Sequence, residues 1–278
     1  MLDALAAATR ALLYAAVLSG AGTVLAEAAL RRQAGGLQPF ATRLMQRGAV
    51  ATMAAASVSA LLLILRLGGF DGATLSAVFL SNTGAAFCFQ FAGSVLILAA
   101  LGDDGTDRAM RLFDAAVVIA SFAVCGHAAA AEGVEFLVAF VHVSAAAWWV
   151  GSLWLLRESC LRQDLATVAA LVRRFSVMAL RLVGVLVAAG VALLLALVDL
   201  SRRPLATPYG RILALKLAVV VLLLGLAGYN RLRLTPRLLA GDGAAVKSLL
   251  RSINAELVAI GAIVVTTAIL TTYTSPGD

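Results

Sequence analysis

The sequence predicts an all-α, polytopic membrane protein, a bundle of eight transmembrane helices with both termini in the periplasm. Of its 278 residues, 62% are apolar and only 13% are charged, whereas a soluble domain is about half apolar and about a quarter charged. The mean hydropathy is +0.98. Eight stretches have the roughly 20 mostly apolar residues that a spanning helix needs. We therefore expect residues 1–278 to form a single transmembrane domain.

The expected spans follow one another along the whole chain. They cover residues 8–30, 48–66, 73–101, 111–131, 134–156, 178–200, 209–230 and 252–273. Several are rich in Gly and Ala, the small residues that let helices pack closely in lipid. The first span resembles a secretory signal, but its basic cluster follows the apolar run instead of preceding it. We interpret it as a span that is retained.

The longest connection, residues 157–177, has a pattern of its own. Apolar residues recur in it at three- and four-residue steps, and arginines lie between them. This pattern is typical of an amphipathic helix on a membrane surface. We therefore expect a separate connecting helix on the cytoplasmic side.

The basic residues predict the orientation. Of the 22 Lys and Arg residues, 16 fall in or beside the first, third, fifth and seventh connections, which the positive-inside bias assigns to the cytoplasm. In a bacterium this places both termini in the periplasm and the protein in the inner membrane. The net charge of +7 thus indicates topology and not nucleic-acid binding. Cys88, Cys125 and Cys160 have no paired spacing, so no disulfide is expected.

The only two histidines, His127 and His142, flank the short break between the fourth and fifth spans. If the hairpin is regular, each imidazole lies roughly 11 Å from the turn, at 1.5 Å per residue. Both would then lie at one depth, in the outer part of the membrane. Ionisable side chains inside a bilayer mark pathways, relays or ligand sites. We expect the two imidazoles to converge on one metal ion.

Three roles remain open for this pair. Imidazole suits copper, zinc, iron and nickel, but two ligands do not complete a tetrahedral zinc site. Two-coordinate copper(I) fits, with Cys125 as a candidate auxiliary ligand, although residues two apart point to nearly opposite sides of a helix. Alternatively, two axial histidines hold a b-type haem that transfers electrons. In a third interpretation the histidines only form hydrogen bonds between helices.

Other polar or aromatic residues are candidates for a pathway beside the histidines. Trp149 shares a helix face with His142 two turns deeper, and Asn82 and Lys216 are expected at the depth of the histidines. The alternatives are a packing role for Trp149, interhelical hydrogen bonding for Asn82, and an ion pair with Asp199 for Lys216. The two acids near the cytoplasmic ends of the first and last spans, Glu27 and Glu256, are expected to pair with nearby arginines.

Four stretches also carry a likeness to a known family. They are Gly126-His127-Ala128, "HVSAAAWWVGSLWLL", "TPYGRILALKLAVVVLLLGLAGYNRLRLTPRL" and "LLRSINAELVAIGAIVVTTAIL". On these residues the chain resembles the copper resistance D (CopD) family of bacterial inner-membrane proteins. The third stretch is the most specific. The resemblance covers about residues 115–272, while the first three spans match only in hydropathy.

The resemblance implies copper transport across the inner membrane, as uptake from the periplasm and without enzymatic activity. It implies His127 and His142 as copper ligands, and a small periplasmic copper-binding protein of the CopC type as the donor. It also covers positions typical of the family but without an assigned role: Tyr209, Gly210, Arg211, Lys216 and Asn230. No CopC-like domain is fused to the chain, so we expect a separate donor. A homo-oligomer would bring four imidazoles together.

Overall fold

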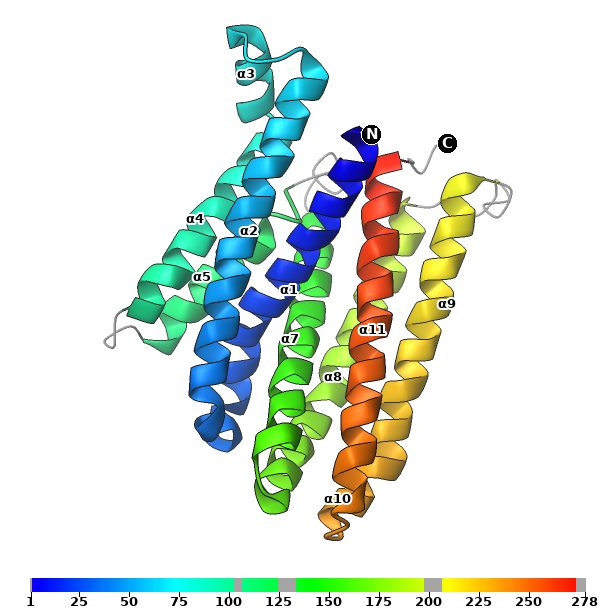
Figure 1. Cartoon of the computed structure of the whole chain (residues 1–278). Coiled ribbons are helices and arrows are strands. Elements are labelled where there is room, and N and C mark those ends of the chain that lie inside the picture. The colour runs from blue at the N-terminus through cyan, green and yellow to red at the C-terminus, as the bar shows by residue number, and fades with distance from the viewer. Residues whose placement is uncertain (1, 103–106, 125–133, 198–206, 274–278) are drawn as a thin grey trace.

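The structure is a computed structural model that describes residues 2–102, 107–124, 134–197 and 207–273. These residues are helical and contain no strand, which confirms the all-α class. Eight helices form the bundle (Figure 1): α1 (Leu2–Ala34), α2 (Gln38–Leu67), α4 (Asn82–Gly102), α5 (Arg108–Ala120), α7 (Val134–Arg162), α8 (Leu165–Leu197), α9 (Pro208–Tyr229) and α11 (Ala244–Tyr273). Four shorter elements join them: η1 (Gly35–Leu37), α3 (Gly72–Phe79), η4 (Asn230–Leu234) and α10 (Thr235–Leu239).

By length and composition, six segments of the described chain qualify as membrane spans, and the first of them, Leu2–Leu67, contains both α1 and α2. The protein is therefore a multi-pass membrane protein. Helix α5 has 13 residues and rises about 20 Å. It is shorter than the span expected over 111–131, because the chain turns after Ala120. Residues 125–131 of that expected span lie outside the described residues.

Helix α1 is held to its two main neighbours through glycines. It packs on α2 and on α7. A Cβ atom added to Gly20 would lie 2.9 Å from the Gly48 Cα on α2, and one added to Gly22 would lie 2.1 Å from the Ala147 carbonyl oxygen on α7. A Cβ atom on Gly151 would in turn lie 2.1 Å from the Gly22 carbonyl oxygen. Backbones this close leave no room for a side chain, which is how helices gain packing energy in lipid.

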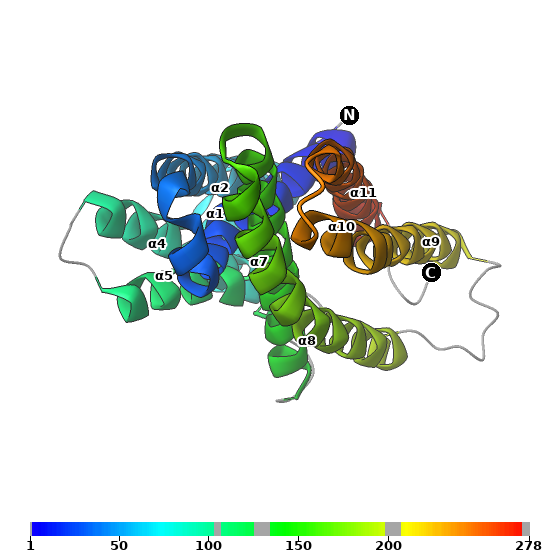
Figure 2. The same cartoon turned by 90° about the horizontal axis from the view of Figure 1, so that it is seen from below.

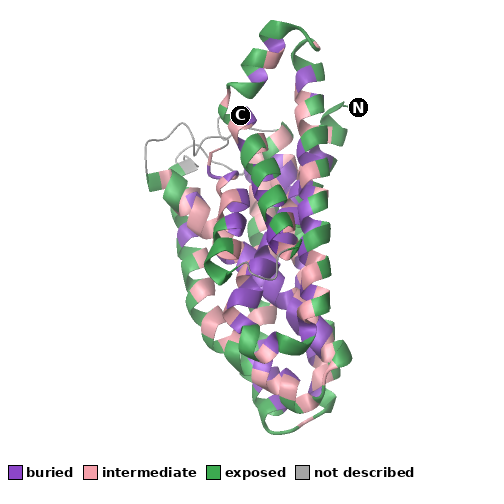
Figure 3. Cartoon of the chain, turned by 90° about the vertical axis from the view of Figure 1, so that its left-hand side faces the viewer, coloured by how far each residue is buried: buried purple, intermediate pink, exposed green. Residues whose placement is uncertain are grey.

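The remaining helices lie on either side of this centre. Seen from below, α4 and α5 lie on one side, and α8, α9 and α11 on the other (Figure 2). Buried residues concentrate inside the bundle, and exposed residues cover its outer faces (Figure 3). Helix α8 packs mainly on α7 and α9 mainly on α11, while α8 and α9 contact each other little. They expose Val191, Val221 and Leu222, as expected for helices against lipid.

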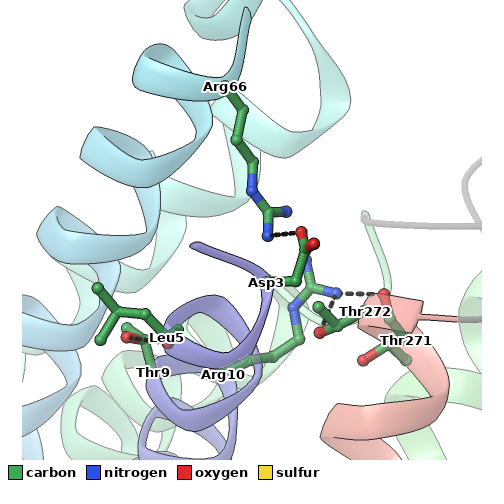
Figure 4. Close-up of polar contacts among 7 residues, drawn as sticks. All are labelled: Asp3, Leu5, Thr9, Arg10, Arg66, Thr271 and Thr272. Atoms are coloured by element: carbon green, nitrogen blue, oxygen red, sulfur yellow. Dashed lines mark hydrogen bonds and ion pairs between the residues drawn. The ribbon is translucent and has the colours of Figure 1, made fainter. Parts of the chain in front are cut away.

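The beginning of α1 is tied to the ends of α2 and α11 (Figure 4). The Arg10 guanidinium donates to the Thr271 carbonyl oxygen and lies 3.4 Å from the Thr272 hydroxyl. Asp3 forms an ion pair with Arg66. The first turns of α1 and the last turn of α11 therefore lie at the same end of the bundle, as an even number of crossings requires.

The span expected over 73–101 is divided into α3 and α4. The Ser81 hydroxyl accepts a hydrogen bond from the Gly84 amide, at 3.1 Å, as a residue that caps a helix N-terminus does. A Cβ atom on Gly84 would lie 2.4 Å from the Val78 carbonyl oxygen. The Ser-Asn-Thr-Gly sequence thus starts a new helix that folds back closely on the end of the previous one.

The segment 157–177 does not form a separate surface helix. It is divided between the end of α7 and the beginning of α8, with Asp164 capping α8 through the Thr167 amide at 2.9 Å. This amide lowers the pKa of the Asp164 carboxyl group below its ordinary value. The apolar side of the segment 157–177 is buried in the protein at Val168 and Leu171, which are 0% exposed. The periodicity therefore reflects helix packing and not contact with a lipid surface.

Candidate functional site

His142 lies on α7 and faces α8. Its Nδ1 atom is 3.1 Å from the Leu186 carbonyl oxygen. The ring comes this close because Gly190 follows one turn later, and a Cβ atom there would lie 3.0 Å from His142 Cε1. A carbonyl oxygen only accepts hydrogen bonds, so Nδ1 carries the hydrogen and Nε2 keeps its lone pair. A backbone carbonyl that orients an imidazole in this way is typical of histidines that bind metals.

The other two candidate ligands, His127 and Cys125, lie outside the described residues. The expected convergence of two imidazoles therefore stays a prediction. Within the described part of the chain, no group of three or more His, Cys, Asp or Glu side chains could hold a metal ion. A metal site at His142 would therefore need ligands from outside the described residues.

Lys216, on α9, lies near enough to His142 for the two side chains to interact electrostatically. Asp199, the partner expected for Lys216, lies outside the described residues. An ammonium group next to an imidazole opposes the binding of a second cation. A charged lysine near His142 would weaken the binding of a metal ion there and would not itself ligate the metal.

Asn82 is exposed at the first position of α4, which packs on α2, α3 and α5. It directly follows Ser81, whose hydroxyl caps this helix. Because His127 lies outside the described residues, the place of Asn82 beside the histidines stays a prediction.

A cavity of about 210 Å³ lies deeper in the same half of the protein. Its walls come from α7, α8, α9, η4, α10 and α11, so it occupies the space where α8 and α9 fail to pack on each other. Most of the lining is apolar. The polar and aromatic groups that reach it are Trp149, Phe175, Ser176, Asn230, Arg231, Thr235 and Glu256.

Trp149, the third predicted pathway residue, forms part of this wall. It is 4% exposed, and its indole N–H lies beside the Glu256 carboxylate without reaching hydrogen-bond geometry. Its ring follows His142 by seven residues, or about 10 Å along the helix. Trp149 is therefore a buried packing residue that lies on α7 between His142 and the rest of the cavity wall.

Glu256 and Asn230 form the polar centre of the cavity wall. Glu256 is 2% exposed and Asn230 is 9% exposed, and the Asn230 side-chain amide donates to the Glu256 carboxylate. The Asn230 Oδ1 atom is buried and has no hydrogen-bond partner within the described residues. The wall therefore holds a carboxyl group with one firm donor and one unused acceptor next to it.

The backbone at Asn230 explains how this pair is presented. Asn230–Leu234 is a π-helix, in which the Thr235 amide bonds back to the Asn230 carbonyl oxygen. Pro236 follows at once and has no amide hydrogen to donate, so it disturbs the regular helical ladder. The Thr235 hydroxyl also donates to the Asn230 carbonyl oxygen, at 3.0 Å. π-helical turns frequently occur at functional sites.

The sequence interpretation of the two acids was right for one and wrong for the other. Glu27 accepts a hydrogen bond from Gln38 at 2.9 Å and pairs with Arg31 at 3.7 Å. Glu256 pairs with Asn230 and not with an arginine. The nearest candidate, Arg231, donates instead to the carbonyl oxygen and hydroxyl of Ser176 on α8. The sequence signals for the cluster were an acid in an apolar span and the family likeness, whose stretches contain both Asn230 and Glu256.

Comparison with known families covers both halves of this architecture. The family model described as copper resistance protein D matches residues 169–270, and the model described as copper resistance protein D-like, N-terminal domain, matches residues 1–137. The chain belongs to the copper resistance protein D family. The N-terminal match corrects the expectation that the first three spans share only hydropathy with the family. No curated protein and no solved structure matches the chain.

These matches place the site residues differently within the copper resistance protein D family. Lys216, Asn230 and Glu256 fall inside the matched region 169–270, whereas His142 and Trp149 fall in the part of α7 between the two matched regions. The family has a role connected with copper in membranes. Its C-terminal region contributes most of the cavity wall.

Proposed function

We propose that this protein transports copper across the bacterial inner membrane, from the periplasm to the cytoplasm, and that His142 and His127 form the outer copper site. The observation that carries the proposal is the membership in the copper resistance protein D family, which extends over both halves of a multi-pass chain. The environment of His142 supports it independently. Its Nδ1 hydrogen is held by the Leu186 carbonyl oxygen, which leaves Nε2 as a ligand.

Copper(I) is the form that such a site would favour. Two imidazole nitrogens satisfy a two-coordinate copper(I) ion, and Cys125 is the candidate that could add a soft ligand. A second protomer could instead supply two more imidazoles. The alternative function, electron transfer through a b-type haem bound by the same two histidines, requires a pocket at His142, and the close approach of Gly190 to that ring gives it no support.

The orientation follows from the arginines at one end of the bundle. Arg31, Arg162 and Arg231 lie at the ends of α1, α7 and α9, which are grouped in Figure 1 at the end opposite the beginning of α1. The positive-inside bias assigns this end to the cytoplasm. In this orientation His142 lies toward the periplasm, and copper passes Trp149 and then the cavity. A separate periplasmic CopC-type protein delivers the ion, and the exposed Arg211 near the beginning of α9 favours an acidic donor.

The proposal is tested by copper uptake into proteoliposomes. Copper(I) is supplied free or bound to a CopC-type protein, and the wild type is compared with His142→Ala and His127→Ala. We expect each variant to lose most of its bound copper and its uptake. The matched control is Gly184→Ala, on α8 but with open space around the new methyl group. Equal copper content in all four proteins, or a haem absorption band in the wild type, would contradict the proposal.

A further inference from the structure

Glu256 is a carboxyl group buried in a membrane-spanning helix beside a cavity. It lies in the middle of α11 and is 2% exposed. An ionised side chain in the apolar part of a bilayer is costly, and such residues pair with one another or mark ion and proton pathways. The question is therefore which group balances its charge.

The cavity wall contains one other charged side chain. Among the lining residues of α7, α8, α9, η4, α10 and α11, only Arg231 and Glu256 are charged. The Arg231 guanidinium is exposed and lies 2.8 Å from the Ser176 hydroxyl. It therefore links η4 to α8 at the rim of the cavity and does not bond to the Glu256 carboxylate.

Helix α1 also packs on α11 and offers no balancing charge. Arg10 bonds to Thr271 and Thr272 at the far end of α11. Near the other end of α1, Arg31 pairs with Glu27. On α7, which also packs on α11, Arg157 donates to the Asn254 side chain at 2.9 Å. Within the described residues, Glu256 thus has amide and indole N–H groups around it and forms no ion pair with a basic side chain.

The neighbours of Glu256 accommodate both of its protonation states. The amide hydrogen of Asn230 stabilises the carboxylate. The unused Oδ1 atom of the same side chain can accept a hydrogen bond from the protonated carboxyl group after a small rotation. The Glu256 carboxyl group therefore has a hydrogen-bond partner both when it is protonated and when it is ionised. This suits a group that binds and releases a proton better than one that forms a permanent ion pair.

We propose that Glu256 exchanges a proton with each copper ion that passes the cavity, which couples copper uptake to proton movement in the opposite direction. This inference rests on the proposed transport of copper. A copper(I) ion in the cavity and a proton on Glu256 both neutralise one carboxylate, so they compete electrostatically. When copper enters from the periplasm, the carboxyl O–H bond breaks and the proton leaves toward the periplasm. When copper leaves to the cytoplasm, one proton returns to the carboxylate from the cytoplasmic rim beside Arg231. No electron is transferred.

The exchange predicts a defined response to a pH gradient. For one copper(I) ion per proton, a gradient of about one pH unit, acidic inside, supports an accumulation of copper of about tenfold, because 1.4 kcal/mol corresponds to a factor of ten. Proteoliposomes containing the purified wild type should reach this accumulation. Those containing Glu256→Gln should equilibrate copper without accumulating it. Glu256→Asp should restore part of the effect.

Asp114 provides the matched control. It lies on α5, is 1% exposed and has no hydrogen-bond partner among the described residues, but it does not line the cavity. Asp114→Asn should keep the response to the gradient. If Glu256→Gln accumulates copper as the wild type does, or if the wild type ignores the gradient while taking up copper, the exchange is refuted and the transport function stands. If the wild type takes up no copper, both proposals fail.

A second measurement does not depend on transport. Infrared difference spectra recorded before and after addition of copper(I) to the wild type should show the loss of a protonated carboxyl band. This band should be absent from the spectra of Glu256→Gln and present in those of Asp114→Asn. An unchanged band in Glu256→Gln would assign the signal to another acid and overturn the inference.

Discussion

The helices around α1 pack much more closely than α8 and α9 do. Around α1, glycines bring backbones into contact, so that Gly22 and Ala147 approach more closely than any side chain would allow. Between α8 and α9, the two helices barely touch and a cavity of about 210 Å³ remains. The first region holds the protein together, and the second leaves polar groups accessible inside the membrane. Tight packing and the cavity thus lie in different parts of the bundle, and α7 takes part in both.

We expect the largest loss of stability from a substitution in the tightly packed region around α1. Gly22→Leu places a side chain against the Ala147 backbone, where even a Cβ atom would lie at 2.1 Å. Overpacking of a core costs about 1–3 kcal/mol when side chains can shift, and a backbone at this distance cannot shift alone. We expect Gly22→Leu to lose the folded, monodisperse protein after detergent extraction.

Its control is Gly261→Ala on α11, where nothing lies within 4 Å of the added methyl group. This variant should elute from size-exclusion chromatography as the wild type does. A Gly22→Leu protein with the elution volume and melting temperature of the wild type would show that the α1–α7 contact does not hold the bundle together.

The next largest effect should come from filling the cavity. Ala227 lines it from α9, and Ala227→Leu adds apolar volume without removing a polar group. Because the lining is mostly apolar, we expect the melting temperature to stay equal or to rise, while copper uptake falls several-fold. Proteins commonly lose activity when a functional space is stabilised. A fall in both stability and uptake would mean that the leucine disturbs packing, and unchanged uptake would remove the cavity from the pathway.

A smaller change is expected at Lys216, which tunes the outer site in the same half. Lys216→Met keeps the length of the side chain and removes the positive charge near His142. Copper(I) should then bind about five- to tenfold more tightly, equivalent to about 1–1.4 kcal/mol. Competition with a chelator of known affinity measures this, and Lys216→Arg serves as the control that keeps the charge. Weaker binding in Lys216→Met would instead make the lysine a supporting group of the site.

The sequence predicted the positions of the helices along the chain better than it predicted which surfaces they contact. Hydropathy located the spans, because about 20 apolar residues have few alternatives to crossing a membrane. It missed the break at Ser81, where capping and a close approach of Gly84 override the apolar run. It also assigned the stripe containing Val168 to lipid, because periodicity alone does not tell which partner a helix face contacts.

The candidate site was predicted only in part. Trp149 lines the cavity. The pairing of His142 with His127 stays a prediction, because His127 lies outside the described residues, and so does the place of Asn82 and Lys216 beside them. The bond between Asn230 and Glu256 joins residues from two helices whose approach depends on a π-helical turn. No local pattern reveals such a contact.

The most direct test of the account is X-ray absorption at the copper edge of the purified protein loaded with one equivalent of copper(I). The account places copper on the Nε2 atom of His142 together with a second imidazole. We expect a low-coordinate shell of imidazole nitrogens in the wild type, and the loss of this shell in His142→Ala. A shell that is the same in the wild type and in His142→Ala would contradict the assignment of copper to α7.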